Sequence, residues 1–140
     1  MGISFFTCPV REVSLCGGCS FSARLLYPFF HAGVLHALLN AWSLLCVVFL
    51  TRISLSRLFA AYLVAVSFPF ACAPTVGLSG VVFALLGRVA FEGARPRVFI
   101  LYSLAVVLLG FLFPKVNAVL HLYCYVAGLL VGFLDSPVRR

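Results

Sequence analysis

Charged side chains, and acidic ones above all, are scarce in this sequence of 140 residues. Only 9% of the residues are charged, and Asp and Glu together number 3. A soluble domain carries roughly 25% charged residues, so most of this surface must face something other than water. With 64% hydrophobic residues and a mean hydropathy of +1.21, the chain is predicted to lie in a lipid bilayer as one compact helical bundle.

The excess of basic over acidic residues, a net charge of +7, would suggest nucleic acid as a partner of a soluble protein. Here the basic residues stand singly or in pairs between apolar runs and form no patch interleaved with aromatic side chains. That distribution is typical of residues that set orientation in a membrane. We therefore expect a lipid bilayer, and no nucleic acid, as partner.

Five apolar segments predict an all-α fold, a polytopic bundle of about five transmembrane helices. They cover residues 27–50, 55–72, 77–91, 98–113 and 117–134. A spanning helix needs about 20 residues, so the short third segment is predicted to begin below the membrane surface. The Pro- and Gly-containing stretch 73–77 must then lie at depth, where non-helical backbone needs shielding by protein or a water-filled cavity. This indicates a site near Ser79.

Arginine placement predicts the orientation of these segments. One side carries Arg52, Arg57, Arg88, Arg95, Arg97, Arg139 and Arg140, whereas the other has Lys115 with Arg11 and Arg24. Basic residues collect on the cytoplasmic side of a membrane protein. We expect a multi-pass protein of the cell's inner or plasma membrane, with a cytoplasmic C-terminus and with residues 74–77 facing outward.

The six cysteines do not predict a metal site. Cys46, Cys72 and Cys124 fall in or near the ends of apolar runs, where a cysteine is usually a small buried apolar residue. Cys8 belongs to the leading segment, as do Cys16 and Cys19, whose spacing would allow a disulfide, zinc binding or redox activity. No second pair follows them, so we favour a structural or incidental role and expect no metal.

Polar side chains open the first apolar segment. His36 and Asn40 are four residues apart and therefore share one face of a helix, and His31 lies a little over one turn earlier. Polar groups in membrane helices usually face a cavity or the bundle interior. Two interpretations remain at this point: a site, or hydrogen bonds that hold neighbouring helices together.

Ser79 lies near the start of the third segment, with Gly77 and Gly80 on either side of Leu78 and Ser79. A serine at a helix start can be a simple N-cap. The glycines, however, remove side-chain bulk, so that a substrate backbone could approach closely. The free N–H groups and the dipole of the first turn favour negative charge. These are the conditions that a nucleophile needs when its reaction generates an oxyanion.

The last segment contains His121 and the pair Gly128 and Gly132, whose spacing lets two helices pack with their backbones close. His121 precedes Gly128 by seven residues, about 20° short of two full turns, and so shares the packing face. If the neighbour is the helix of Ser79, His121 could serve as its base. Otherwise it would be a hydrogen bond inside the bundle.

Taken together, these residues resemble the signature of the rhomboid proteases. The resemblance rests on His31, His36 and Asn40 in this order, on the run Gly-Leu-Ser-Gly-Val-Val-Phe-Ala-Leu-Leu-Gly at 77–87, and on Ala-Gly-Leu-Leu-Val-Gly at 127–132. It covers roughly residues 24–135. It implies a rhomboid-like membrane domain over residues 24–140, preceded by a non-spanning segment over residues 1–23.

The resemblance also implies a function: an intramembrane serine endopeptidase that cleaves transmembrane segments of membrane proteins and uses no metal or cofactor. Ser79 would be the nucleophile and His121 the base. The oxyanion would be stabilised by His36 and Asn40 and by the backbone at Leu78 and Ser79. The structural members of the motif would be His31, Gly77, Gly80, Gly128 and Gly132.

The sequence departs from the family pattern at several places, and one of them, Tyr125, supports an alternative function. Tyr125 occupies the usual histidine position three residues before Gly128, and His121 lies one turn earlier, about 6 Å along the helix. A base has to lie within about 3 Å of its proton. In addition, Phe83 replaces a frequent tyrosine, and the family's first span has no equivalent in residues 1–10. The alternative is a catalytically inactive rhomboid-like pseudoprotease that binds membrane helices.

Overall fold

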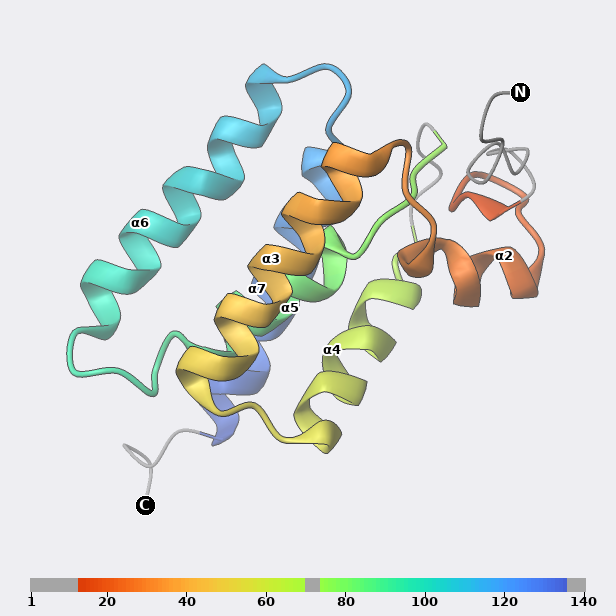
Figure 1. Cartoon of the computed structure of the whole chain (residues 1–140). Coiled ribbons are helices and arrows are strands. Elements are labelled where there is room, and N and C mark those ends of the chain that lie inside the picture. The colour runs from red at the N-terminus through yellow and green to blue at the C-terminus, as the bar shows by residue number, and fades with distance from the viewer. Residues whose placement is uncertain (1–12, 70–73, 136–140) are drawn as a thin grey trace.

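The computed structural model describes residues 13–69 and 74–135, which form a bundle of helices (Figure 1). These residues contain no strand, so the all-α prediction is confirmed for them, and Leu15 and Thr75 form an isolated bridge. In chain order the helices are α2 (Phe21–Leu26), η1 (Tyr27–Phe29), α3 (Val34–Thr51), α4 (Leu55–Val66), α5 (Ser79–Val89), α6 (Pro96–Leu109), η2 (Gly110–Leu112) and α7 (Ala118–Asp135).

The helices alternate in direction, with α5 at the centre. In Figure 1, α3, α5 and α7 run one way through the bundle, and α4 and α6 run the other way. The central helix α5 contacts α3, α4, α6 and α7. As a result, the first residue of α5 and the first turn of α7 lie toward the same end of the bundle.

Each of the five predicted segments contains a helix, but their lengths differ. Within the described residues only α3 and α7, of 18 residues each, are long and apolar enough to cross a membrane unaided. The shorter apolar helices are α4, α5, and α6 continued by η2. With 11 residues, α5 is about 16 Å long, roughly half of a hydrocarbon core of ~30 Å. Five full spans therefore remain a prediction.

Two helix boundaries differ from the prediction by six residues or more. The first long helix begins at Val34 rather than Tyr27, because Gly33 before it has extended backbone. The second ends at Val66, whereas the prediction ran to Cys72, which lies outside the described residues. The Arg24 guanidinium donates to the carbonyls of Val66 (3.2 Å) and Phe68 (2.6 Å). Arg24 thus satisfies carbonyls at the helix end that have no partner within the helix.

Glycines bring the backbones of α5 and α7 into contact. A Cβ atom on Gly128 would lie 2.1 Å from the Ala84 carbonyl oxygen, and one on Gly132 would lie 2.2 Å from that of Arg88. From the other side, a Cβ atom on Gly87 would lie 2.2 Å from the Tyr125 carbonyl oxygen. No side chain fits at these distances. The close packing predicted from the spacing of Gly128 and Gly132 is confirmed.

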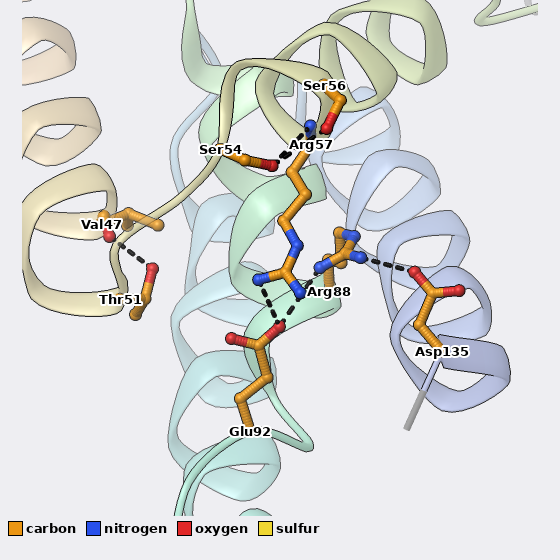
Figure 2. A network of polar contacts seen from close by, with 8 residues as sticks. All are labelled: Val47, Thr51, Ser54, Ser56, Arg57, Arg88, Glu92 and Asp135. Atoms are coloured by element: carbon orange, nitrogen blue, oxygen red, sulfur yellow. Dashed lines mark hydrogen bonds and ion pairs between the residues drawn. The ribbon is translucent and has the colours of Figure 1, made fainter. Parts of the chain in front are cut away.

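At the opposite end from Ser79, a charge network joins α4, α5 and α7 (Figure 2). Arg88, only 7% exposed, donates to Glu92 Oε1 (3.2 Å) and to an oxygen of Asp135. Arg57 pairs with the same Glu92 oxygen at 3.1 Å. Two of the chain's three acidic residues therefore serve to neutralise Arg88.

The network predicts an asymmetric effect on stability. Arg88 is buried, whereas Glu92 and Asp135 are partly exposed and can be hydrated when unpaired. The double variant Glu92→Gln/Asp135→Asn should therefore lose about 2 kcal/mol of unfolding free energy, because it leaves a buried guanidinium without an anion. Arg88→Met, of similar volume, should lose less than about 1 kcal/mol. Unfolding by titration with a denaturing detergent measures both values, and a larger loss for Arg88→Met would contradict this explanation.

Candidate active site

A cavity of about 730 Å³ opens between the start of α3, the loop before α5 and the start of α7. Apolar residues of α3 form part of its wall. The polar side chains that line it are His36, Asn40, Ser43, Thr75, Ser79, Lys115, Asn117 and His121. The structure thus brings together four residues that the sequence selected, Ser79, His121, His36 and Asn40, from three different helices.

Ser79 and His121 are in hydrogen-bonding contact. Ser79 is the first residue of α5, and His121 is on the first turn of α7. The distance from Ser79 Oγ to His121 Nε2 is 2.8 Å, which lies within the reach required of a base. This arrangement can pass the hydroxyl proton to the imidazole.

Cys124 explains how His121 reaches the serine although it precedes Gly128 by seven residues. A Cβ atom on Gly80 would lie 3.4 Å from Cys124 Sγ, so Cys124 is the small residue that packs beside the serine turn. Gly128 packs deeper in the bundle, against Ala84. His121 lies three residues before Cys124, the same spacing that the family pattern places between the histidine and the first glycine. The position of His121 therefore requires no displacement of α7.

Tyr125, the residue in the expected histidine position, faces α6 instead of Ser79. Its hydroxyl lies 2.7 Å from Ser103 Oγ and donates to the Ile100 carbonyl at 3.3 Å. Four residues turn a side chain by about 40° around the helix and move it about 6 Å along the axis. That rotation takes Tyr125 away from the cavity, and its side chain is fully buried between α7 and α6.

Phe83 fixes the plane of the His121 ring. The two rings stack with centroids 4.4 Å apart and an interplanar angle of 29°. Phe83 lies on α5 one turn after Ser79, so the helix that carries the hydroxyl also carries the platform for the imidazole. The stack requires an aromatic face, which phenylalanine supplies without a hydroxyl group.

His36 and Asn40 converge on Gly77, two residues before Ser79. A Cβ atom on Gly77 would meet His36 Nε2 at 3.0 Å and Asn40 Nδ2 at 3.4 Å, and Gly77 has φ +118°, a conformation that favours glycine. Asn40 Nδ2 also donates to the His36 carbonyl at 2.9 Å. Leu78 is the N-cap residue of α5, so the N–H of Ser79 belongs to the first turn, which has no partner within the helix.

His31 lies before the start of α3, whereas the predicted segment 27–50 had placed it in the same helix as His36. Its ring is nevertheless edge-on to that of His36, with centroids 5.4 Å apart. Its Nε2 atom is buried and has no hydrogen-bond partner among the described residues. Burial and the neighbouring His36 lower the pKa of His31. The ring of His31 therefore packs against that of His36.

Asn117 and Thr75 line the cavity and were not among the predicted site residues. Asn117 Oδ1 accepts from the backbone N–H of Leu120 (3.0 Å), while its Nδ2 donates to Thr75 Oγ1 at 2.8 Å. Thr75 in turn pairs through its backbone with Leu15. An asparagine directly before a helix is an N-cap signal that could have identified Asn117. Its tie to Thr75 could not be read from the sequence.

None of the described cysteines lines the cavity that contains Ser79. Cys16 and Cys19 both have free thiols, and the backbone N–H of Cys19 donates to the Cys16 carbonyl. Cys124 is fully buried, as expected, whereas Cys46 is only half-buried. Cys8 and Cys72 lie outside the described residues.

The fold and the site together define an all-α bundle with long apolar helices and a serine–histidine pair in a cavity at one end. The sequence matches the model of the Rhomboid domain over residues 19–138. The chain therefore belongs to the rhomboid family, a family of integral membrane proteins whose members are generally intramembrane serine proteases. Searches of curated proteins and of solved structures gave no match.

Proposed function

We propose that this rhomboid-family protein is an active intramembrane serine endopeptidase that cleaves transmembrane segments of membrane proteins. The observation that supports the proposal most is the 2.8 Å contact between Ser79 Oγ and His121 Nε2. A serine hydroxyl is a weak nucleophile until an adjacent base accepts its proton. Tyr125, the residue that favoured an inactive pseudoprotease, is bonded to Ser103 and leaves His121 in contact with the serine.

In the proposed reaction, Ser79 Oγ attacks the carbonyl carbon of the scissile peptide bond while His121 Nε2 takes the hydroxyl proton. The tetrahedral intermediate carries its negative charge on the former carbonyl oxygen. His36, Asn40 and the backbone N–H of Ser79 are the groups we propose to stabilise it. His121 then returns the proton to the leaving amine, and an ester forms between Ser79 and the new carboxyl end.

Water completes the cycle. His121 accepts a proton from a water molecule in the cavity as that molecule attacks the ester carbonyl, and Ser79 leaves with the proton restored. The products are a carboxylic acid and a free amine on the two halves of the cut segment. The cavity of about 730 Å³ offers room for such a water molecule beside the pair.

The proposed orientation places this cavity toward the outer side of the membrane and the C-terminus in the cytoplasm. Five of the arginines assigned to the cytoplasmic side are described, and they lie at or near the ends of helices opposite Ser79: Arg52, Arg57, Arg88, Arg95 and Arg97. Positive residues favour the cytoplasmic side, which supports the proposed direction.

A fluorophosphonate probe tests the proposal, since it bonds covalently only to an activated serine. The purified protein in mild detergent should be labelled at Ser79, as located by mass spectrometry, and should cleave a single-span membrane protein in vesicles. Ser79→Ala should abolish both signals. Ser43→Ala is the matched control, because Ser43 lines the same cavity and should leave labelling intact. Absence of labelling in folded wild-type protein would favour the pseudoprotease.

A further inference from the structure

Lys115 is the one formally charged side chain among the described residues that line the cavity, and none of those residues is acidic. The two described acidic residues, Glu92 and Asp135, are engaged with arginines at the other end of the bundle. Among the described residues, Lys115 forms no ion pair.

The backbone that carries Lys115 is held in place beside the serine–histidine pair. Lys115 follows Pro114 in a tight turn that closes with a hydrogen bond of 3.0 Å from the Val116 N–H to the Phe113 carbonyl. The next residue, Asn117, bonds to Thr75. The turn is therefore joined both to the helix of His121 and to the loop that leads to Ser79, which holds the backbone of Lys115 at the cavity.

The other wall of the cavity is apolar and accepts a different part of a substrate. Val34, Leu35 and Leu39 of α3 line it, and all three are exposed. A membrane segment with its scissile bond at Ser79 would lay apolar side chains on this wall and extend its polar flank past Lys115. A carboxylate on that flank would meet an ammonium group that has no competing acid among the described residues.

We propose that Lys115 determines specificity, favouring transmembrane segments that carry Asp or Glu on the outer flank of the bond presented to Ser79. The inference rests on the proposed function for the identity of the substrate, but the recognition itself is binding and requires no chemistry. An ion pair at a partly exposed site changes affinity by about three- to fivefold. The preference should weaken as salt shortens the Debye length from about 10 Å at 0.1 M to about 3 Å at 1 M.

Binding to the Ser79→Ala protein tests the inference without cleavage. The protein is placed in nanodiscs of neutral phosphatidylcholine, and three labelled transmembrane peptides that differ only in having Asp, Asn or Lys at one outer flanking position are titrated. We expect the Asp peptide to bind about three- to fivefold more tightly than the Asn peptide, and the Lys peptide to bind most weakly. Lys115→Glu should invert the order.

Arg97→Glu is the matched control, because it changes the net charge by the same amount. Arg97 is exposed at the start of α6, at the end of the bundle opposite the cavity. It should leave the order Asp, Asn, Lys unchanged. Equal affinities for the three peptides, no binding of any of them, or an order that survives Lys115→Glu would overturn the inference. Failure of the proposed function has a different signature: no probe labelling of the wild-type protein, with the binding order unaffected.

Discussion

Substituting alanine for His121 should lower kcat/KM for cleavage by at least about a thousandfold, whereas Tyr125→Phe should change it by less than about tenfold. His121 Nε2 is the ring nitrogen in contact with Ser79 Oγ, at 2.8 Å. The Tyr125 hydroxyl is bonded to Ser103 and Ile100 on α6, so its loss weakens a contact between helices and leaves the hydroxyl of Ser79 paired. Cleavage of a single-span substrate in vesicles and the rate of probe labelling measure the difference.

The two substitutions also distinguish an active protease from an inactive pseudoprotease. If labelling survives in His121→Ala and disappears in Tyr125→Phe, the base has been assigned to the wrong residue. If neither variant nor the wild-type protein reacts, while all three unfold at the same denaturant concentration, the chain is a binding protein with an intact fold. A matched folding measurement is needed because His121 also stacks on Phe83.

Gly128→Ala should destabilise the protein by more than about 3 kcal/mol and should abolish labelling of Ser79. The new methyl carbon would lie 2.1 Å from the Ala84 carbonyl oxygen and 2.9 Å from the carbonyl carbon. Because both atoms belong to the backbone, no side-chain rotation relieves the overlap, and α5 must move away from α7. Forced overpacking usually costs about 1–3 kcal/mol, and a direct clash between two backbones is at the upper end or beyond.

Gly93→Ala provides the control for this prediction. A Cβ atom on Gly93 would have no heavy-atom neighbour within 4 Å, so the free energy of unfolding should stay within about 0.5 kcal/mol of the wild-type value. Detergent titration followed by circular dichroism compares the two variants. A Gly128→Ala protein that unfolds together with Gly93→Ala and still reacts with the probe would show that the contact between α5 and α7 is looser than described.

The parts of the site that depend on local spacing could be predicted from the sequence. His36 and Asn40 are four residues apart, and a helix of any origin places them on the same face. Gly77 and Gly80 beside Ser79 mark a backbone that must be approached closely, and Gly77 indeed has the positive φ that favours glycine. Gly128 and Gly132 likewise predicted close packing of the last helix. Each of these inferences needs only the geometry of one helix or one turn.

The pairing of Ser79 with His121 was predicted through the resemblance to the rhomboid family, because spacing within one helix does not show which helices are neighbours. Tyr125 lies three residues before Gly128, where the family pattern places the base. In the structure, Cys124 packs against Gly80, and this contact brings His121 to Ser79. The start of α3 was placed too early, since apolar composition alone does not distinguish a helix from the short turns before it. Such errors of a few residues are enough to exchange one candidate base for another.

The sequence by itself determined that the helices face lipid, that the fold is all-α, and which family the chain resembles. Scarcity of charge, long apolar runs and short motifs are local features, so they do not depend on how the helices are arranged. Tertiary structure alone decided which imidazole meets the serine, which acids neutralise Arg88, and that Lys115 stands at the rim of the cavity. The physical reason is that these contacts depend on the relative register of packed helices. A displacement of one turn along the axis, about 5.4 Å, changes every partner while leaving each helix the same.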